Sequence, residues 1–267
     1  MKSAGHKIAA DVPMLDLSRQ YAGIRNEILA AVARVCDSQH YILGEEVAAF
    51  EREFAALCAT ADCVGCASGT DGLWLALAAA GVGPGDSVIT TPFSFFATAS
   101  SILRAGAKPV FADVDPETLN LDPASVEERL KRSPKEICAI MPVHLYGQCA
   151  DMDAFSRIAA DFKVHMVEDA AQAVGATWNG KRAGSLSLAA AFSFYPTKNL
   201  SAFGDAGAVT TSDAKLAERM RSLRNHGGKQ RYYHDEVGAN SRLDSIQAAV
   251  LRVKMPSCAK RSPCITR

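Results

Sequence analysis

The sequence has no excess of charge of one sign, because 29 lysine and arginine residues are matched by 29 aspartate and glutamate residues. Such a chain has no general attraction for nucleic acid or for an anionic membrane surface. It also has no run of about 18 apolar residues that could cross a bilayer, and no apolar stretch followed by a cleavage site near its start. We therefore expect a cytoplasmic protein that works on small molecules.

The eight cysteines do not form a pattern that indicates disulfides or zinc. In a chain of this length without a secretory signal, thiols are expected to stay reduced. Cys63 and Cys66 form a C-x-x-C pair inside an apolar run, with no second pair at zinc spacing. We expect these two residues to be buried thiols rather than metal ligands or a redox pair, and we expect no metal site.

The apolar residues, 48% of the chain, are distributed in short runs that alternate with helical segments and turns. Residues 15–37 and 45–58 have the apolar spacing of amphipathic helices. The later runs are CVGCA, DSVITT, KPVFADV, ICAIMPVHL, HMVEDA, AAAFSFY and GAVTTS. This alternation favours an α/β fold with a mostly parallel sheet covered by helices on both faces. In such folds, ligands bind beyond the carboxyl ends of the strands, so the residues after each run are candidates for a site.

The first candidate strand end is ASGTDGLWLAL, where Ser68, Gly69 and Thr70 lead directly into a helix. The first N–H groups of a helix have no intrahelical partner, and together with the helix dipole they favour an anion such as a phosphate. An ordinary N-cap, without a ligand, explains the same residues. The second is TPFSFFATAS, whose phenylalanines are of a type that is usually buried in the core, although one ring could stack on a flat ligand.

The third candidate is HMVEDAAQAVGA, where Glu168 and Asp169 close a strand and Gln172 follows. The chain has no phosphate-binding loop of the G-x-x-x-x-G-K type and no metal-ligand spacing here. A carboxylate bonded to a protonated ring nitrogen is the remaining functional interpretation. The fourth is AFSFYPTKNLSAFGDAGAVTT, where Lys198 follows a strand and Ser193 precedes it. A partly desolvated lysine can capture a carbonyl, although a lone turn lysine is usually solvated.

These four strand ends together supply the parts that hold pyridoxal phosphate: an anion site, a flat aromatic, a carboxylate for the ring nitrogen and a lysine for the aldehyde. The chain also resembles a known family over a set of motifs in the same order. These are ASGTDGLWLAL, GVGPGDSVITTPFSFFATAS, GAKPVFADVD, PVHLYGQCADMDAF, VEDAAQAVGA, FSFYPTKNL, GDAGAVTT and VGANSRLDSIQAAVL. The family is that of the DegT/DnrJ/StrS pyridoxal-phosphate sugar aminotransferases, which have the fold type I large domain. The resemblance runs from about Val12 to about Lys254.

The resemblance implies roles for residues that match the family motifs. Lys198 would bind the aldehyde of pyridoxal 5′-phosphate and serve as general acid and base. Asp169 would pair with the pyridine nitrogen, Gln172 would lie near the ring hydroxyl, and Phe95 would stack on the ring. His144 and Tyr195 would lie near the active site, without an assigned role. The cofactor phosphate would be bound by Gly69, Thr70, Ser193 and Asn240, the last from the neighbouring subunit, so a homodimer with shared sites is expected.

The implied reaction moves an amino group, usually from glutamate, to a nucleotide-linked keto-sugar in amino-sugar, polysaccharide or antibiotic-sugar biosynthesis. Some family members act instead on a keto-cyclitol. A lysine at position 198 favours transamination over the dehydration that a sister group with histidine performs.

The chain departs from the family pattern at two places, and both bear on the expected function. Ala206 stands where the family usually has glycine, and the segment after Lys254 reads MPSCAKRSPCITR instead of leading into a C-terminal domain. We expect a helical segment at 1–40, the cofactor-binding large domain at 41–253, and an atypical tail at 254–267 in place of most of the small domain. A truncated, non-catalytic cofactor-binding or regulatory protein is therefore the alternative function.

Overall fold

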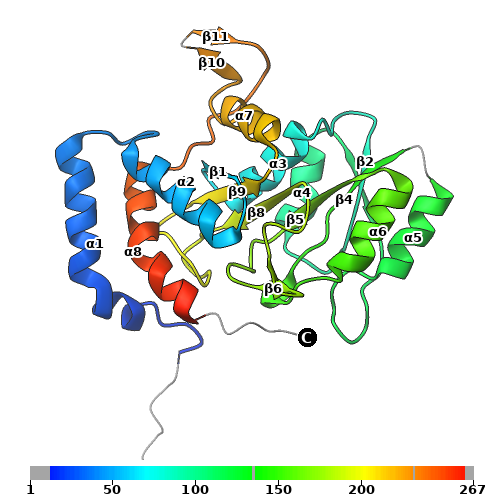
Figure 1. Ribbon diagram of the computed structural model, residues 1–267, viewed down its shortest axis with the longest axis horizontal. Coiled ribbons are helices and arrows are strands. Elements are labelled where there is room, and N and C mark those ends of the chain that lie inside the picture. Colours follow the sequence, from blue (N-terminus) through cyan, green and yellow to red (C-terminus); the bar gives the residue numbers. More distant parts are fainter. Residues whose placement is uncertain (1–12, 134–135, 231, 262–267) are drawn as a thin grey trace, which may run out of the picture.

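The central sheet of the computed structural model, which describes residues 13–133, 136–230 and 232–261, has seven strands (Figure 1). Their order is β1 (Asp62–Cys66), β9 (Gly207–Thr211), β8 (Ala189–Ser193), β5 (His165–Asp169), β4 (Ile137–Ile140), β2 (Ser87–Thr90) and β3 (Lys108–Phe111). From β8 to β3 all neighbours are parallel, whereas β9 is antiparallel to both β8 and β1. The prediction of a mostly parallel sheet is confirmed, and each of the seven apolar runs supplies one strand. Two small hairpins, β6 (Thr177–Trp178) with β7 (Lys181–Arg182) and β10 (Gly228–Gln230) with β11 (Tyr233–His234), lie outside it.

Helices cover both faces of the sheet, as the sequence predicts. One face packs against α3 (Gly69–Ala79), α4 (Phe96–Arg104) and α7 (Ala214–Leu223). The other packs against α2 (Glu45–Cys58), α5 (Pro123–Arg132), α6 (Met152–Phe162) and α8 (Ser245–Arg261). The short 3-10 helix η1 (Leu145–Gly147) follows β4. Within the described residues, no helix is long and apolar enough to cross a membrane.

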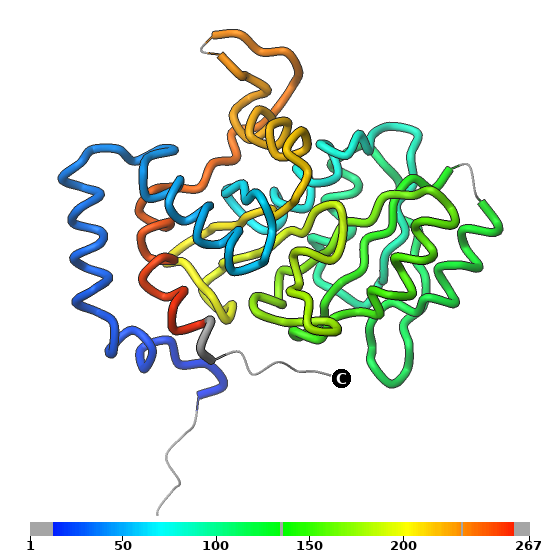
Figure 2. The backbone as a smooth tube through the Cα atoms, in the orientation of Figure 1, coloured from blue at the N-terminus to red at the C-terminus, as the bar shows by residue number. Residues whose placement is uncertain are grey.

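The first helix, α1 (Ser18–Ser38), packs beside the last helix, α8, at one edge of the molecule (Figure 2). Ala31 and Val35 of α1 meet Ala249 of α8 in a small buried cluster. The boundary expected between residues 253 and 254 falls inside α8, which runs on to Arg261. The division of the chain into three parts stays a prediction.

The C-x-x-C pair shows how strand alternation separates the two layers. Because side chains alternate along a strand, residues three apart point to opposite faces. Cys63 packs in the core against α2 and α8, whereas Cys66 packs in the core against α3 and α7. Both thiols are free and buried, and burial raises the pKa of each. The prediction of buried thiols is confirmed; Cys264 lies outside the described residues.

Aromatic packing fixes the strand that precedes the candidate lysine. Phe192 and Phe194, at the end of β8, make edge-to-face contacts with Phe54 of α2, with ring centroids 5.0 Å and 5.2 Å away. Phe50 stacks on Phe54 at 5.5 Å. Truncating a buried phenylalanine of this kind costs about 3–5 kcal/mol of the unfolding free energy. The residues that follow β8 are therefore held from a rigid base.

Candidate active site

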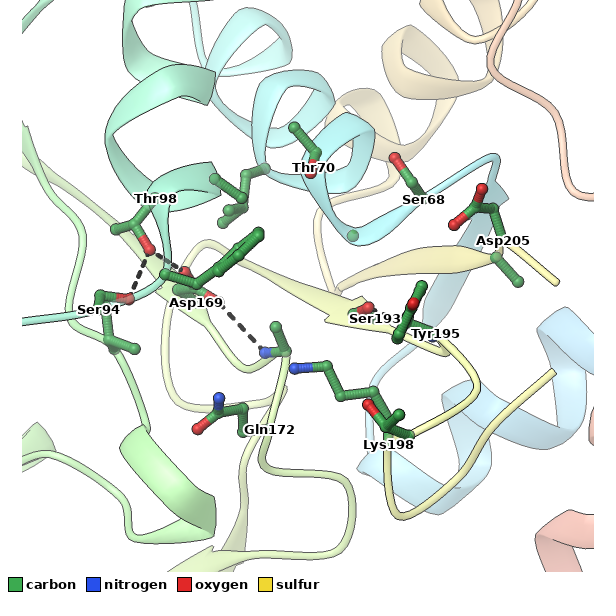
Figure 3. A pocket seen from close by; sticks show the side chains of 18 residues that line it. Ser68, Thr70, Ser94, Thr98, Asp169, Gln172, Ser193, Tyr195, Lys198 and Asp205 are labelled. Atoms are coloured by element: carbon green, nitrogen blue, oxygen red, sulfur yellow. Dashed lines mark hydrogen bonds between the residues drawn. The ribbon is translucent and has the colours of Figure 1, made fainter. Parts of the chain in front are cut away.

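A cavity of about 550 Å³, called here the strand-end cavity, lies where several strands end and α3 and α4 begin (Figure 3). Seven of the eight residues predicted to bind the cofactor line it: Gly69, Thr70, Phe95, Asp169, Gln172, Ser193 and Lys198. Asn240 does not line the cavity of its own chain; it is exposed and pairs through its backbone with Asn225. The roles of all eight residues remain predictions, but seven of them share one space.

The start of α3 forms one end of the strand-end cavity. The Ser68 side chain caps the helix, since its hydroxyl accepts a hydrogen bond from the Asp71 N–H at 3.1 Å. The N-cap interpretation is thus correct, and it does not exclude the binding of an anion at the first turn. The N–H groups of Gly69 and Thr70 belong to the first turn, where no intrahelical carbonyl is available to them. With the helix dipole, this end of the cavity is suited to an anion.

Two glycines let three segments meet at this end of the cavity. A Cβ added at Gly69 would stand 2.6 Å from the Ser193 Cβ, which is too close for any side chain. A Cβ at Gly207 would overlap the backbone carbonyl of Ser68. Glycine at both positions brings Ser193 at the end of β8, and the first residue of β9, against the start of α3. The Ser193 hydroxyl is consequently placed beside the first helical turn.

Asp169, the last residue of β5, is the buried acid of the cavity, and it is 4% exposed. Its Oδ2 accepts a hydrogen bond from the Thr98 hydroxyl at 2.7 Å, and its Oδ1 accepts one from the Ala171 N–H at 3.3 Å. Burial raises the pKa of Asp169, whereas the hydrogen bonds from Thr98 and Ala171 oppose that rise. The carboxylate retains free lone pairs, because each oxygen accepts only one of these bonds.

Glu168 precedes Asp169 but points to the opposite face of the sheet, as alternation along a strand requires. Its Oε2 lies 3.0 Å from His144 Nε2, and both side chains are fully buried. The Gly184 N–H and the Ser187 hydroxyl also donate to this carboxylate, at 2.8 Å and 2.9 Å. The Ala150 N–H donates to His144 Nδ1, so the ring proton is on Nε2 and donates to Glu168. Glu168 therefore connects His144 with the loop that carries Gly184 and Ser187, behind the site, and it does not face the cavity.

Lys198 lies in the turn after β8, where its backbone N–H donates to the Tyr195 carbonyl at 2.8 Å. Its side chain is half-buried and lines the cavity, with the amine directed toward the side where Asp169 lies (Figure 3). Desolvation lowers the pKa of Lys198, and the negative charge of Asp169 opposes that decrease. The solvated turn lysine of the alternative interpretation is not what the structure shows. The amine is available in a partly dry space that also contains an acid.

The phenylalanines of the second strand end are exposed, so the expectation that such residues are mostly core is wrong here. Phe93, Phe95 and Phe96 are 48%, 75% and 73% exposed. The reason is local, because α4 begins at Phe96 and the preceding turn stands at the edge of the cavity, where no described segment covers it. Phe95 lines the cavity, as its predicted stacking role requires.

Gln172 and Tyr195 also face the cavity. The Gln172 Oε1 accepts a hydrogen bond from the Tyr146 N–H at 2.7 Å, which fixes the amide at one side of the space. His144, expected near the site, lies behind it, and its backbone N–H donates to the Asp169 carbonyl at 3.0 Å. Ala206, where the family pattern has glycine, is buried and lines the cavity wall.

Sequence reasoning missed Ser94 and Thr98, which lie beside Asp169 (Figure 3). Asp205 also lines the cavity without having been singled out. The one available signal was the spacing of Ser94 and Thr98 around Phe95, since residues four apart meet on one side of a helix start. That spacing does not reveal that Thr98 has a partner, Asp169, 71 residues further along the chain.

Comparison with known proteins identifies the family of these residues. The model of a family described as "DegT/DnrJ/EryC1/StrS aminotransferase family" matches residues 22–262. A pleiotropic regulatory protein of Geobacillus stearothermophilus is 54% identical over 246 residues, which are 92% of this chain and 65% of that protein. A dTDP-3-amino-3,4,6-trideoxy-alpha-D-glucose transaminase of Streptomyces venezuelae is 50% identical over 244 residues, covering 91% of this chain and 64% of the transaminase.

A solved structure supports the same assignment. It is a crystal structure of NtdA from Bacillus subtilis with bound cofactor PMP, with a TM-score of 0.88 and 31% sequence identity. The match covers 95% of this chain and 58% of NtdA. This chain thus spans about 65% of the length of the first two relatives and less of NtdA.

Proposed function

The chain belongs to the DegT/DnrJ/EryC1/StrS aminotransferase family, and we propose that it binds pyridoxal 5′-phosphate in the strand-end cavity. The proposed reaction moves an amino group, with glutamate as donor, onto a nucleotide-linked keto-sugar. The observation that carries the proposal is that Lys198 and Asp169 face one cavity whose far end is the start of α3. A cytoplasmic location, expected from the sequence, is part of the proposal.

The residues of the cavity fit this cofactor in size and in chemistry. A space of about 550 Å³ is ample for one substituted pyridine ring with its phosphate. The first turn of α3, with Gly69, Thr70 and the Ser193 hydroxyl, offers donors for a dianionic phosphate. Asp169, at the other side of the cavity, offers a carboxylate for a protonated ring nitrogen. NtdA carries PMP, the amino form of the same cofactor, on the same fold.

The two titratable residues have distinct tasks in this proposal. When bound, pyridoxal phosphate supplies an electron-accepting ring and an aldehyde. Desolvation lowers the pKa of Lys198, which favours the neutral amine that the proposal requires at its Nζ, and the same amine would carry a proton to and from the reacting carbon. Asp169, whose ionised form is favoured by its two hydrogen bonds, would hold a proton on the ring nitrogen. Phe95 provides a ring face at the mouth of the cavity.

The proposed substrate class follows from the relatives, several of which have names that specify amino sugars on a nucleotide. Besides the dTDP-sugar transaminase, these include a UDP-N-acetyl-3-dehydro-alpha-D-glucosamine 3-aminotransferase of Acidithiobacillus ferrooxidans. For this chain, the sugar, the donor and a homodimer that brings Asn240 to the partner's phosphate are proposals. A second candidate is a regulatory cofactor-binding protein, which the name of the Geobacillus relative favours.

The first prediction concerns Lys198. The chain purified with pyridoxal phosphate is expected to be yellow and to lose its visible absorption band when glutamate is added. Lys198→Ala should abolish that band, because it removes the amine that binds the aldehyde. Lys215→Ala, at an exposed position of α7, is the matched control and should remain yellow.

The outcomes separate the candidates. A chain that binds no cofactor, or one that stays yellow after Lys198→Ala, contradicts the cofactor proposal. A yellow chain whose spectrum no amino donor changes supports the regulatory candidate over the aminotransferase.

A further inference from the structure

Two hydroxyl groups connect the turn that carries Phe95 to the buried acid of the cavity. Thr98 Oγ1 lies 2.7 Å from Asp169 Oδ2, and Ser94 Oγ lies 2.7 Å from Thr98 Oγ1 (Figure 3). Thr98 is 2% exposed and Ser94 is partly buried. Resting on the proposed function, we infer that Ser94 and Thr98 form a hydroxyl relay that holds Asp169 ionised and correctly oriented.

The direction of the relay follows from counting protons. An ionised carboxylate can only accept hydrogen bonds, so the one proton of Thr98 Oγ1 must be donated to Asp169. The second contact of Thr98 then has to be one in which its oxygen accepts, and Ser94 must donate. Both hydroxyl protons therefore point toward the acid. A proton on Asp169 Oδ2 would make Thr98 accept instead of donate, which would also reverse the hydrogen bond with Ser94.

The helix that bears Thr98 supports the same interpretation. At the start of α4, Phe95 is the N-cap and provides no side-chain cap. A serine or threonine at the N-cap itself would bond to a free N–H group of the first turn, but Ser94 precedes the N-cap and Thr98 lies within that turn. Here the Ser94 and Thr98 hydroxyls contact each other and Asp169, and the positive end of the α4 dipole lies beside the carboxylate. The polar groups of this helix start are directed to the acid.

Burial explains why Asp169 needs the relay. Desolvation favours the protonated acid, and a neutral Asp169 could not hold a proton on the ring nitrogen of a bound cofactor. The hydrogen bonds from Thr98 and from the Ala171 N–H act in the opposite direction. In Thr98→Val a methyl group would fill the place of the almost fully buried hydroxyl, so water cannot take that place. Thr98 and Ser94 are thus positioning residues, which act through Asp169.

The second prediction is that Thr98→Val raises the pKa of Asp169 by about one to two units, as expected for loss of a hydrogen bond to a charged group. Valine keeps the shape of threonine and removes the donor to Asp169, together with the acceptor for Ser94. The measurement is a pH titration of the Asp169 carboxyl carbon by NMR, in protein without cofactor, with Asp169→Asn to assign the signal. Thr98→Ser keeps the donor and should restore the original titration. Ser94→Ala should give a smaller rise, because Thr98 still donates.

A packing role for Thr98 predicts the reverse order of the variants. Thr98→Ser loses the buried methyl group and would then be the more perturbed protein, whereas Thr98→Val would titrate as the unchanged chain does. That result would overturn the relay. If Thr98→Val does not fold, the Ser94→Ala titration decides, and an unchanged Asp169 pKa in that variant overturns the relay as well.

A second measurement connects the relay to the proposed cofactor. At a pH halfway between the Asp169 pKa values of the unchanged chain and of Thr98→Val, the dissociation constant for pyridoxal phosphate should rise about three- to tenfold in Thr98→Val and recover in Thr98→Ser. The carboxyl titration is made without cofactor, so it stands or fails independently of this measurement. Failure of the unchanged chain to bind pyridoxal phosphate would contradict the proposed function and leave the titration to judge the relay.

Discussion

At the scale of single residues, the site depends as much on absent side chains as on present ones. Gly69 and Gly207 contribute no functional group, yet each allows a backbone approach that a methyl group would block. Lys198, Asp169 and Ser193 could all be present and still not share a cavity if these segments were further apart. The two glycines are therefore needed to place the functional groups in one cavity.

The third prediction tests this placement with Gly207→Ala. The new methyl group would overlap the Ser68 carbonyl, so β9 must move away from the start of α3. We expect a loss of about 1–3 kcal/mol in the free energy of unfolding and weaker cofactor binding. Chemical denaturation and cofactor titration measure the two effects.

Gly23→Ala is the matched control for that substitution. Gly23 lies inside α1, and a Cβ there would have no neighbour within 4 Å. Alanine at this position should stabilise the chain by up to about 1 kcal/mol through its higher helix propensity. Equal stability of the two variants would contradict the steric argument.

The candidate site shows which residues the sequence alone can identify. Lys198, Asp169 and Gly69 each follow an apolar run, so their common place beyond the strand ends could be predicted from an open α/β fold. The Ser94 and Thr98 pair could not, because its partner is set by how α4 packs against the end of β5. The exposure of Phe95 and Phe96 could not be predicted from the sequence either, because it depends on how the other segments pack around them.

At the scale of elements, the strands and helices were predictable because each has the apolar period of its type. The runs HMVEDA and AAAFSFY became β5 and β8, and EEVAAFEREFAALC became α2. The order of strands was not predictable, and neither was the antiparallel direction of β9. Both depend on connections between segments far apart in sequence. The direction of β9 matters for function, since it begins at Gly207 beside the start of α3.

Helix α8 supports the turn that follows Lys198, and it does so with a buried amine. Lys254 is 6% exposed, and its Nζ donates to the Ser201 hydroxyl at 3.0 Å and lies 4.6 Å from the Phe203 ring centroid. Another residue of α8, Gln247, accepts a hydrogen bond from the Phe203 N–H at 2.7 Å. Burial lowers the pKa of Lys254 to about 8. The contact of Lys254 with this turn therefore buries a positive charge, which costs free energy.

The fourth prediction is a pH dependence of stability that originates at Lys254. Below about pH 8 the folded chain holds a buried ammonium group, and the free-energy cost of desolvating this charge is fully present. The pKa of Lys254 is about 8 in the folded chain and near 10.5 in the unfolded chain. Between these two pH values the folded chain has lost the proton and the unfolded chain still holds it, so the free energy of unfolding rises with pH. Lys254→Met should therefore be about 1–2 kcal/mol more stable than the unchanged chain at pH 7, after allowance for the lost contacts.

Denaturant titrations at several pH values check this dependence. The advantage of Lys254→Met should shrink as the pH approaches 10, whereas Lys215→Met, at an exposed position, should give no such change. A constant difference between Lys254→Met and the unchanged chain across this range would show that Lys254 is not the titrating group.

At the scale of the whole molecule, the position of Asn240 is the remaining question about the proposed site. In one chain, this residue is exposed and outside the strand-end cavity, although it was predicted to bind the cofactor phosphate. The two facts agree if Asn240 serves the cavity of a second copy. Closed dimers with twofold symmetry would then contain two equivalent composite sites.

The fifth prediction uses mixed dimers to test such sharing. Lys198→Ala removes the lysine from its own cavity, and Asn240→Ala removes the asparagine from its partner's cavity. In a mixed dimer, the cavity of the Asn240→Ala chain retains its own Lys198 and receives Asn240 from the other chain. The opposite cavity lacks both.

At a cofactor concentration too low for either variant alone to bind, equal mixing and reassociation of the two variants should restore the yellow band to about a quarter of the sites. If Asn240 acts within its own chain, both cavities of the mixed dimer stay defective and no band returns. Recovery of the band therefore distinguishes a site shared between two chains from a site formed by one chain.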